Sequence, residues 1–162
     1  MIVPLDLIDR KMLEILQANA RTPNSEIAER LGMAPSATFE RHRKLERKGV
    51  IKAYETRLDP GKINLPLVAF VFVRTNEGAG EAIVAPKLIA IPHVLEVYNV
   101  AGEDCYLVKM RAADTTMLGR LIREQIGQIP GVTSTRTTIV MEAYKETGIL
   151  PLEQTEDTVK GK

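Results

Sequence analysis

The chain is poor in the residues that build disulfides, metal sites and aromatic clusters. Its 162 residues include one cysteine, two histidines and no tryptophan, and aromatic residues make up only 4%. Cys105 has no second cysteine to pair with, and the histidines are not spaced as metal ligands. A histidine–acid–nucleophile grouping and a glycine-rich phosphate loop are also missing. We therefore expect no cofactor, no metal site and no enzyme activity.

Long apolar runs and a strong overall charge are missing as well. The longest apolar run, Leu65–Val73, is far too short to cross a membrane, and the first residues lack the basic segment of a signal peptide. We therefore expect a cytoplasmic protein without membrane association. Because 22 lysines and arginines nearly balance 21 acids, any strongly positive surface has to be local.

Positive charge is concentrated in one predicted helix, Pro35–Lys48. From Arg41 to Lys52 there are six cations against a single acid, Glu46. A dense positive stripe attracts phosphate backbones and releases their counterions. A charged helix face can also be merely solvated, so the stripe alone does not decide between the two interpretations.

The segment before this helix favours DNA binding. Ser25–Gly32 has the apolar spacing of a short helix, with Thr22 as its predicted cap and Gly32 as its end. A helix, a short turn and a basic helix form the helix-turn-helix pattern. The preceding Leu5–Asn19 carries an apolar stripe that can cover the back of the pair, and residues 50–59 are β-prone, as in a wing or a linker strand.

A second pattern begins after the turn cluster Asp59-Pro60-Gly61. Strands are predicted at residues 66–74, 94–100, 106–111 and 132–144, and helices at 81–90 and 114–128. The order β-α-β-β-α-β is that of a ferredoxin-like domain. We predict an α+β chain with a winged helix-turn-helix domain and linker at 1–60, a βαββαβ domain for ligand binding and oligomerisation at 61–147, and a polar C-terminal tail at 148–162.

One face of the predicted sheet is left uncovered by the two helices. Alternate residues of the first strand, such as Leu67, Ala69, Val71 and Val73 or their neighbours, are expected to form it. A second copy of the domain is the simplest cover for this face.

Four motifs, in the same order along the chain, resemble the Lrp/AsnC family of feast/famine transcription regulators over about residues 5–146. They are LDLIDRKMLEILQANAR, LGMAPSATFERHRKLERKGVIKAY, AGEDCYLVKM and IPGVTSTRTTIVMEAYKET. The resemblance implies a sequence-specific DNA-binding transcription regulator whose DNA binding or assembly responds to an amino acid or related metabolite. It also implies a homodimer on double-stranded DNA that assembles further, often to an octamer.

The expected DNA-binding residues are Ser36, Thr38, Glu40, Arg41, His42, Arg43, Lys44 and Lys48. Ser36 and Arg41 are the best candidates for base or phosphate contacts, and the later cations should act mainly on phosphates. The family prefers aliphatic residues where this chain has Thr38 and His42. His42 is therefore open to two interpretations, packing against the first helix or contact with a phosphate.

The effector pocket is expected between subunits, at Gly102, Glu103, Asp104, Cys105, Tyr106, Thr135 and Thr137. Gly102 permits close backbone approach, an acid of the turn accepts the ammonium, and the two threonines, on one strand face, hold the carboxylate. Each feature has a plainer interpretation: a polar hairpin turn, a small strand residue at Cys105, and threonines chosen for β-propensity.

Cys105 also keeps a second function open. Some leucine-responsive members of the family have an aspartate where this chain has Cys105, and that carboxylate is implicated in the effector response. The alternative is an effector-independent architectural DNA-binding protein that has lost amino-acid sensing.

Overall fold

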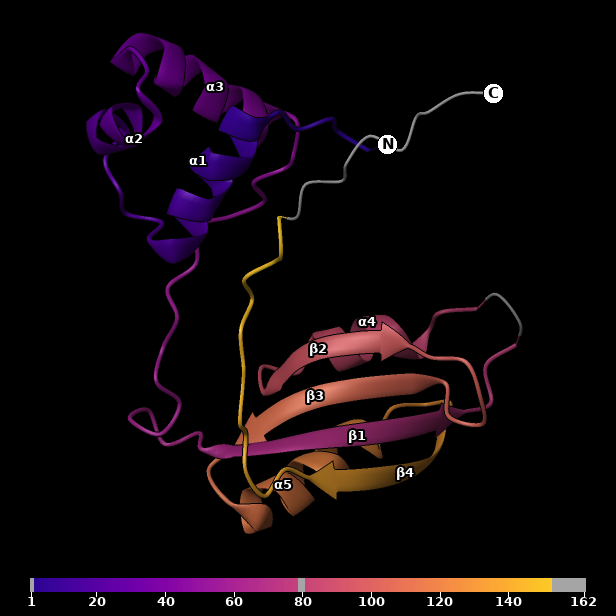
Figure 1. Ribbon diagram of the computed structural model, residues 1–162. Helices are drawn as coiled ribbons and strands as arrows, with labels where there is room; N and C mark the ends of the chain where they lie inside the picture. The colour runs from indigo at the N-terminus through magenta and orange to yellow at the C-terminus, as the bar shows by residue number, and fades with distance from the viewer. Residues whose placement is uncertain (1, 79–80, 153–162) are drawn as a thin grey trace. The chain divides into compact units, whose positions relative to one another are not determined.

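The computed structural model describes residues 2–78 and 81–152 and divides into two compact units (Figure 1). Among the described residues, one unit contains 2–57 together with 146–152, and the other contains 58–78 and 81–145. Residues 153–162 of the predicted tail lie outside the described part of the chain.

The first unit is built from helices α1 (Leu7–Ala18), α2 (Asn24–Leu31) and α3 (Pro35–Arg47). They enclose a small apolar core that includes Met12, Leu13, Leu16, Ile27 and Leu45. Gly32 adopts a left-handed φ of 64° at the end of α2, and the chain turns within three residues into α3. Glycine adopts this conformation without steric cost. The predicted helix-turn-helix is confirmed.

Two local features of this unit differ from the sequence prediction. Thr22 does not cap α2, because its Oγ1 donates instead to the Asn19 carbonyl at 2.8 Å and closes the turn after α1. Residues 50–59 contain no strand. A strand needs a hydrogen-bonded partner, and the sheet of the described residues consists of β1 to β4 only.

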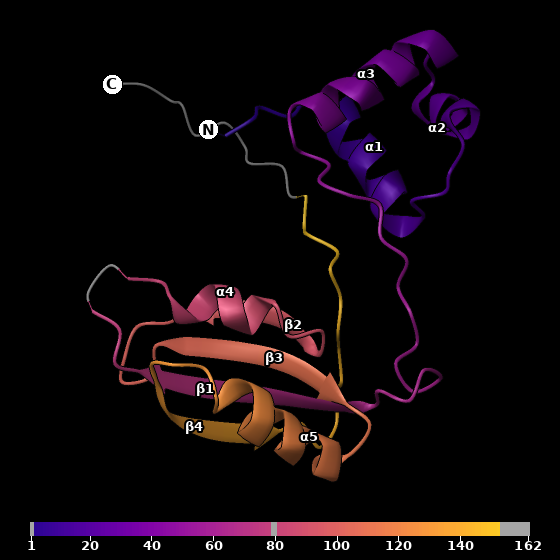
Figure 2. The ribbon, with the colours of Figure 1, turned by 180° about the vertical axis from the view of Figure 1, so that it is seen from behind.

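The second unit is a four-stranded sheet with two covering helices. Its elements are β1 (Leu67–Thr75), α4 (Val84–Ile89), β2 (Val94–Asn99), β3 (Tyr106–Ala112), α5 (Thr115–Leu121) and β4 (Val132–Ile139). The strand order is β2-β3-β1-β4 and every pair is antiparallel. Figure 2 shows α4 and α5 on the same side of the sheet. The predicted ferredoxin-like arrangement is confirmed.

Three element ends in this unit differ from the pattern-based prediction. The helix predicted from residue 81 begins at Val84, because the Glu77 carboxylate accepts the backbone N–H groups of Ile83 and Val84. Helix α5 passes into a π-helical turn, η1 (Ile122–Ile126). Strand β4 ends at residue 139, where it reaches the beginning of its partner strand β1.

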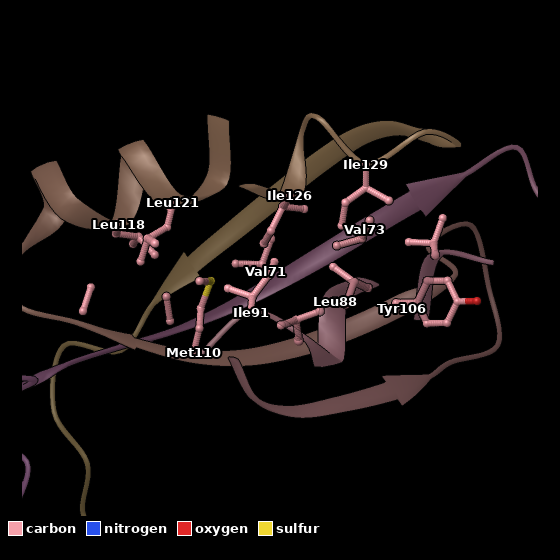
Figure 3. Close-up of a cluster of buried hydrophobic side chains, with 14 residues drawn as sticks. Val71, Val73, Leu88, Ile91, Tyr106, Met110, Leu118, Leu121, Ile126 and Ile129 are labelled. Carbon is pink, nitrogen blue, oxygen red and sulfur yellow. The ribbon is translucent and has the colours of Figure 1, made fainter. Parts of the chain in front are cut away.

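The core of the second unit lies between the sheet and its helices (Figure 3). Ala69, Val71 and Val73 are fully buried on this side. The prediction that these residues form the uncovered face is therefore wrong, and the alternative that it named, their neighbours in the strand, is the one observed. The alternating neighbours, including Phe70 and Phe72, lie on the open face and remain partly exposed.

After β4 the chain returns to the first unit. The Gln17 side chain of α1 donates to the Leu150 carbonyl at 3.0 Å and accepts the Leu150 N–H at 2.7 Å. Arg57 donates to the Glu146 carbonyl, and Leu152 packs against the helical core. Residues 146–152 are therefore part of the helical unit in space, although they follow the sheet in sequence.

Candidate DNA-reading helix and effector region

The outward face of α3 carries most of the predicted DNA-binding side chains. The exposed polar residues of α3 and its C-cap are Ser36, Glu40, Arg43, Lys44, Glu46, Arg47 and Lys48. Phe39 is 47% exposed, and the Arg43 guanidinium carbon lies 5.4 Å from the centre of its ring. A phenylalanine exposed to water gains little for folding, and one stacked with a cation is suited to contact with a base.

Thr38 lies on the inward face of α3 and is fully buried. Its Oγ1 donates to the Ala34 carbonyl at 3.1 Å, which satisfies the hydroxyl inside the helix. The expected contact between the Thr38 side chain and DNA is therefore wrong, since the helical period turns this residue toward the core.

Arg41 also faces inward, toward the start of α1. Its Nη1 lies 2.5 Å from Asp6 Oδ2 and 2.7 Å from Asp9 Oδ1. The hydrogen bonds to Asp9 and then to Asp6 raise the pKa of Arg41. The Asp9 backbone N–H and, after it, Arg41 outweigh burial and lower the pKa of Asp6. The guanidinium predicted to contact DNA is thus bound within the chain.

His42 has a partner that neither of its two interpretations included. Its Nε2 lies 2.5 Å from the hydroxyl of Tyr54 in the linker, and that hydroxyl donates to Glu46 at 2.9 Å. Burial and then the Glu46 carboxylate raise the pKa of Tyr54 to about 12. His42 therefore connects α3 with the linker, because the chain turns back beside α3 after Gly49.

The hairpin between β2 and β3 holds the predicted effector acids. Gly102 has a φ of 125°, which favours glycine, and nothing lies near its missing side chain. Glu103 pairs with Arg74 at 2.7 Å, and Asp104 pairs with Arg136 at 2.9 Å. The two acids expected to receive an ammonium thus already hold guanidinium groups.

The next two candidates are built into the sheet. Cys105 is half-buried, with its Sγ 3.9 Å from the Thr75 carbonyl. Tyr106 is 4% exposed, and its hydroxyl donates to Glu77 at 3.0 Å. Burial and then Glu77 raise the pKa of Tyr106. Tyr106 also lines a hollow of about 400 Å³ with residues of α4 and β2, among them Ala85 and Asn99.

Thr135 and Thr137 lie opposite Val73 and Val71 in the β1–β4 ladder, on the side covered by the helices. Arg136 lies on the open side, 3.9 Å above the centre of the Phe72 ring. Because Arg136 draws Asp104 toward that side, the threonine hydroxyls and this hairpin acid belong to opposite faces of the sheet. Within one chain they do not converge on a common pocket.

In residues 2–78 and 81–152, no helix has the length and apolar character that a membrane span requires. The same residues contain no cluster of three or more histidine, cysteine or acidic side chains arranged to hold a metal ion.

Two protein-family models match the chain. A winged helix-turn-helix DNA-binding model matches residues 5–52, which contain α1 to α3. A model of the Lrp/AsnC ligand binding domain matches residues 68–150, which include the whole β1–β4 sheet except its first residue. The chain belongs to the Lrp/AsnC family. Its family resemblance is thus carried by both units.

Known members of the Lrp/AsnC family match over nearly their full length. The HTH-type transcriptional regulator FL11 of Pyrococcus horikoshii is 39% identical over 93% of this chain and 99% of its own. The leucine-responsive regulatory protein of Escherichia coli is 34% identical, over 92% of each chain. A transcriptional regulator of Neisseria meningitidis, solved in complex with L-methionine, is 30% identical with a TM-score of 0.86, over 92% of this chain and 97% of its own.

Two exposed residues of α3 were missing from the set predicted by the sequence. Phe39 follows Ser36 by three residues and precedes Arg43 by four, so the helical period places it beside both. Arg47 extends the same face by one turn. The helical spacing is sufficient to identify both residues, whereas charge identifies only Arg47, and Arg47 lies beyond the N-terminal half of the helix.

Proposed function

We propose that the outward face of α3 enters the DNA major groove and reads base sequence there. The single observation that carries this proposal is a helix-turn-helix whose second helix, α3, leaves the cations Arg43, Lys44 and Arg47 exposed, in a chain of the Lrp/AsnC family. Ser36, Phe39 and Arg43 are placed to contact bases, and Glu40 is placed to accept from a cytosine amine. The cations Lys44, Arg47 and Lys48 contact phosphates.

The second part of the proposal is a response to an amino acid. The complex of the Neisseria relative with L-methionine supports this ligand class. The hairpin acid Asp104 and the pair Thr135 and Thr137 supply complementary groups, but on opposite faces of one sheet. We therefore propose that the pocket is completed by residues of another subunit, so that ligand binding shifts assembly by its different affinity for the assembled states.

Assembly is proposed to begin with a homodimer through the open sheet face and to continue to an octamer. Phe70, Phe72 and the buried Val68 give this face an apolar strip without helical cover. Phe72→Glu should place a charge in the interface and shift the dimer equilibrium toward monomer by at least about tenfold. Analytical ultracentrifugation tests this, with the exposed Lys87→Glu as the control.

These proposals assign a separate role to each domain. We propose a DNA-reading domain at residues 1–60, a sensing and assembly domain at 61–147, and a tail at 148–162. The proposed role is regulatory rather than catalytic, without a cofactor. It places the chain with the DNA in the cytoplasm. An effector-independent architectural protein is the second candidate, because Cys105 replaces an acid and the neighbouring acids are already paired.

The decisive experiment starts from operators selected out of a random DNA library. Fluorescence anisotropy then measures their affinity with and without each of the twenty amino acids. The proposal expects a preference for selected over random DNA and a change in affinity or assembly with at least one amino acid. Selected binding that no amino acid alters supports the architectural alternative, and equal binding to all sequences contradicts both reading and regulation.

A further inference from the structure

The polar contacts between α1 and α3 form one closed network at the start of α1. Asp6 Oδ1 accepts the Asp9 N–H at 2.7 Å, and Asp9 Oδ2 accepts the Asp6 N–H at 3.3 Å. These two bonds make the capping box that begins α1. The remaining oxygen of each carboxylate binds the same nitrogen of Arg41. Each carboxylate thus accepts a backbone N–H of the α1 cap with one oxygen and binds Arg41 of α3 with the other.

The Arg41–Asp9 pair of the network is shielded more than an ordinary surface ion pair. Asp9 is 8% exposed as a residue, and the Arg41 side chain is 27% exposed. Because water and salt screen such a pair less than an exposed one, its geometry resists displacement. A DNA phosphate competing for Arg41 would have to leave a nearly buried carboxylate of Asp9 without its cation.

Arg41 also lies on the side of α3 opposite to the proposed reading residues. Thr38 and Leu45, three before and four after it, are buried, whereas Ser36, Arg43 and Arg47 are exposed. A helix packed only by small apolar contacts can rotate about its axis or slide. A directional pair of charge-assisted hydrogen bonds near its middle restricts both movements.

We propose that Arg41 is a positioning residue, which sets the rotation of α3 against α1 through Asp6 and Asp9 and does not itself contact DNA. The inference rests on the proposed reading face of α3. Arg41, one of the two best candidates for DNA contact in the sequence analysis, is thereby removed from the set of contacting residues. The two acids of the LDLID segment are also assigned to the accuracy of DNA reading.

Binding measurements separate positioning from direct contact. Affinities for a selected operator and for a random duplex of equal length are measured as a function of KCl concentration. Arg41→Ala should weaken operator binding by about tenfold, as for a misaligned base contact, while the salt slope stays that of the wild type. Lys44→Ala is the matched control on the same helix, and it should lower the salt slope by about one.

Asp6→Asn gives the sharpest contrast. The asparagine Oδ1 can still accept the Asp9 N–H, so the cap is retained, but the second oxygen for Arg41 is replaced by a donor. Positioning expects a smaller operator-to-random affinity ratio. Direct contact expects the reverse, tighter binding to both DNAs, because the variant frees Arg41 and removes a negative charge. Tighter binding, or a salt slope lowered by about one in Arg41→Ala, overturns the proposal.

The operator-to-random affinity ratio also distinguishes positioning by Arg41 from a role in stability alone. If Arg41→Ala or Asp6→Asn lowers the unfolding temperature but leaves the operator-to-random ratio unchanged in the folded protein, Arg41 does not position α3. Arg41→Lys, whose ammonium can also bridge two carboxylates, should restore part of the ratio. Should Arg41→Ala fail to fold, Asp6→Asn alone still decides the question, since it changes few atoms at a half-exposed site.

The distance between α1 and α3 can be measured without DNA, so this test does not depend on the proposed function. Nitroxide labels at the exposed positions Lys11 on α1 and Arg47 on α3 report the distance between the helices by pulsed electron resonance. Arg41→Ala should broaden or shift the distance distribution, and Lys44→Ala should not. An unchanged distribution in Arg41→Ala overturns positioning, whether or not the wild-type protein distinguishes DNA sequences.

Discussion

The outward face of α3 and the hairpin between β2 and β3 both carry charged side chains, but these charges are in opposite states. Among the residues that the structure describes, Lys44, Arg47 and Lys48 have no acidic partner, whereas Glu103 and Asp104 each hold an arginine. Free charges keep a field that attracts phosphate, and paired charges largely cancel theirs. In the proposed function, the helix receives DNA without exchanging a partner, whereas the hairpin has to release an arginine before it accepts an ammonium.

In the proposed function, this difference separates a DNA-reading site that one chain completes from an effector site that needs a second subunit. The reading face lies on a single helix, and its own unit supplies the core and the Arg41 network that hold that helix. The effector candidates are spread over a hairpin and the two faces of a sheet. A dependence on other subunits is thus expected for sensing and not for the local structure of the reading helix.

The largest effect is expected from a substitution that unfolds the helical unit and so abolishes DNA reading. Leu45 is 2% exposed in the helical core, and Leu45→Asp buries an unpaired charge there, at a cost of at least about 3 kcal/mol. We expect the helical unit to unfold and DNA binding to be lost, while NMR signals of the sheet unit persist. Lys11→Asp, at an exposed position of α1, is the control. Retained operator binding in Leu45→Asp would contradict the description of this core.

The free charges of α3 can be removed without touching the core. Replacing Lys44, Arg47 and Lys48 together by alanine should lower the slope of log affinity against log salt by about three, because each phosphate contact contributes about 0.9. Binding to random DNA, measured by anisotropy over a KCl series, checks this. Lys87→Ala in α4 serves as a control for net charge. A slope equal to that of the wild type would place the phosphate contacts elsewhere.

The paired charges of the hairpin are tested with L-methionine as the probe. If Asp104 exchanges Arg136 for the ligand ammonium, Asp104→Asn should weaken binding by about tenfold, since it removes a charge-assisted hydrogen bond. Arg136→Ala, which frees the carboxylate, should strengthen binding. Calorimetry measures both, and Glu96→Gln in β2 is the control. Affinities that stay equal in both variants would show that Asp104 is not the ammonium acceptor.

The smallest effect concerns the linker beside α3. The pKa of Tyr54 is raised from 10.0 to about 12 in the folded chain. The stability that this tyrosine contributes is therefore complete below its unfolded pKa and is lost as pH rises from about 10 to about 12. Urea unfolding in this range should show a steeper loss of stability for wild type than for Tyr54→Phe. Because Tyr54 is half-exposed, the difference should be small, and parallel curves would argue against the bond to Glu46.

The order of the elements was predictable from local patterns. The α3 cations, the turn at Gly32 and the β-α-β-β-α-β order all follow from spacing along the chain. Such patterns depend on neighbours within a few residues, where the helix and strand periods apply directly. The shortened α4 was not predictable, because its start depends on Glu77, which lies seven residues before Val84.

The sequence by itself determined which segments become helices and strands, where positive charge gathers, and which family the chain resembles. Only the tertiary structure decided which of these charges are free. Arg41 and Lys44 look alike in the sequence, but Arg41 meets acids 32 and 35 residues away, and Lys44 meets none among the described residues. Glu103 and Asp104 likewise meet arginines from distant strands. Pairing depends on distance in space, which chain folding sets and local sequence does not record.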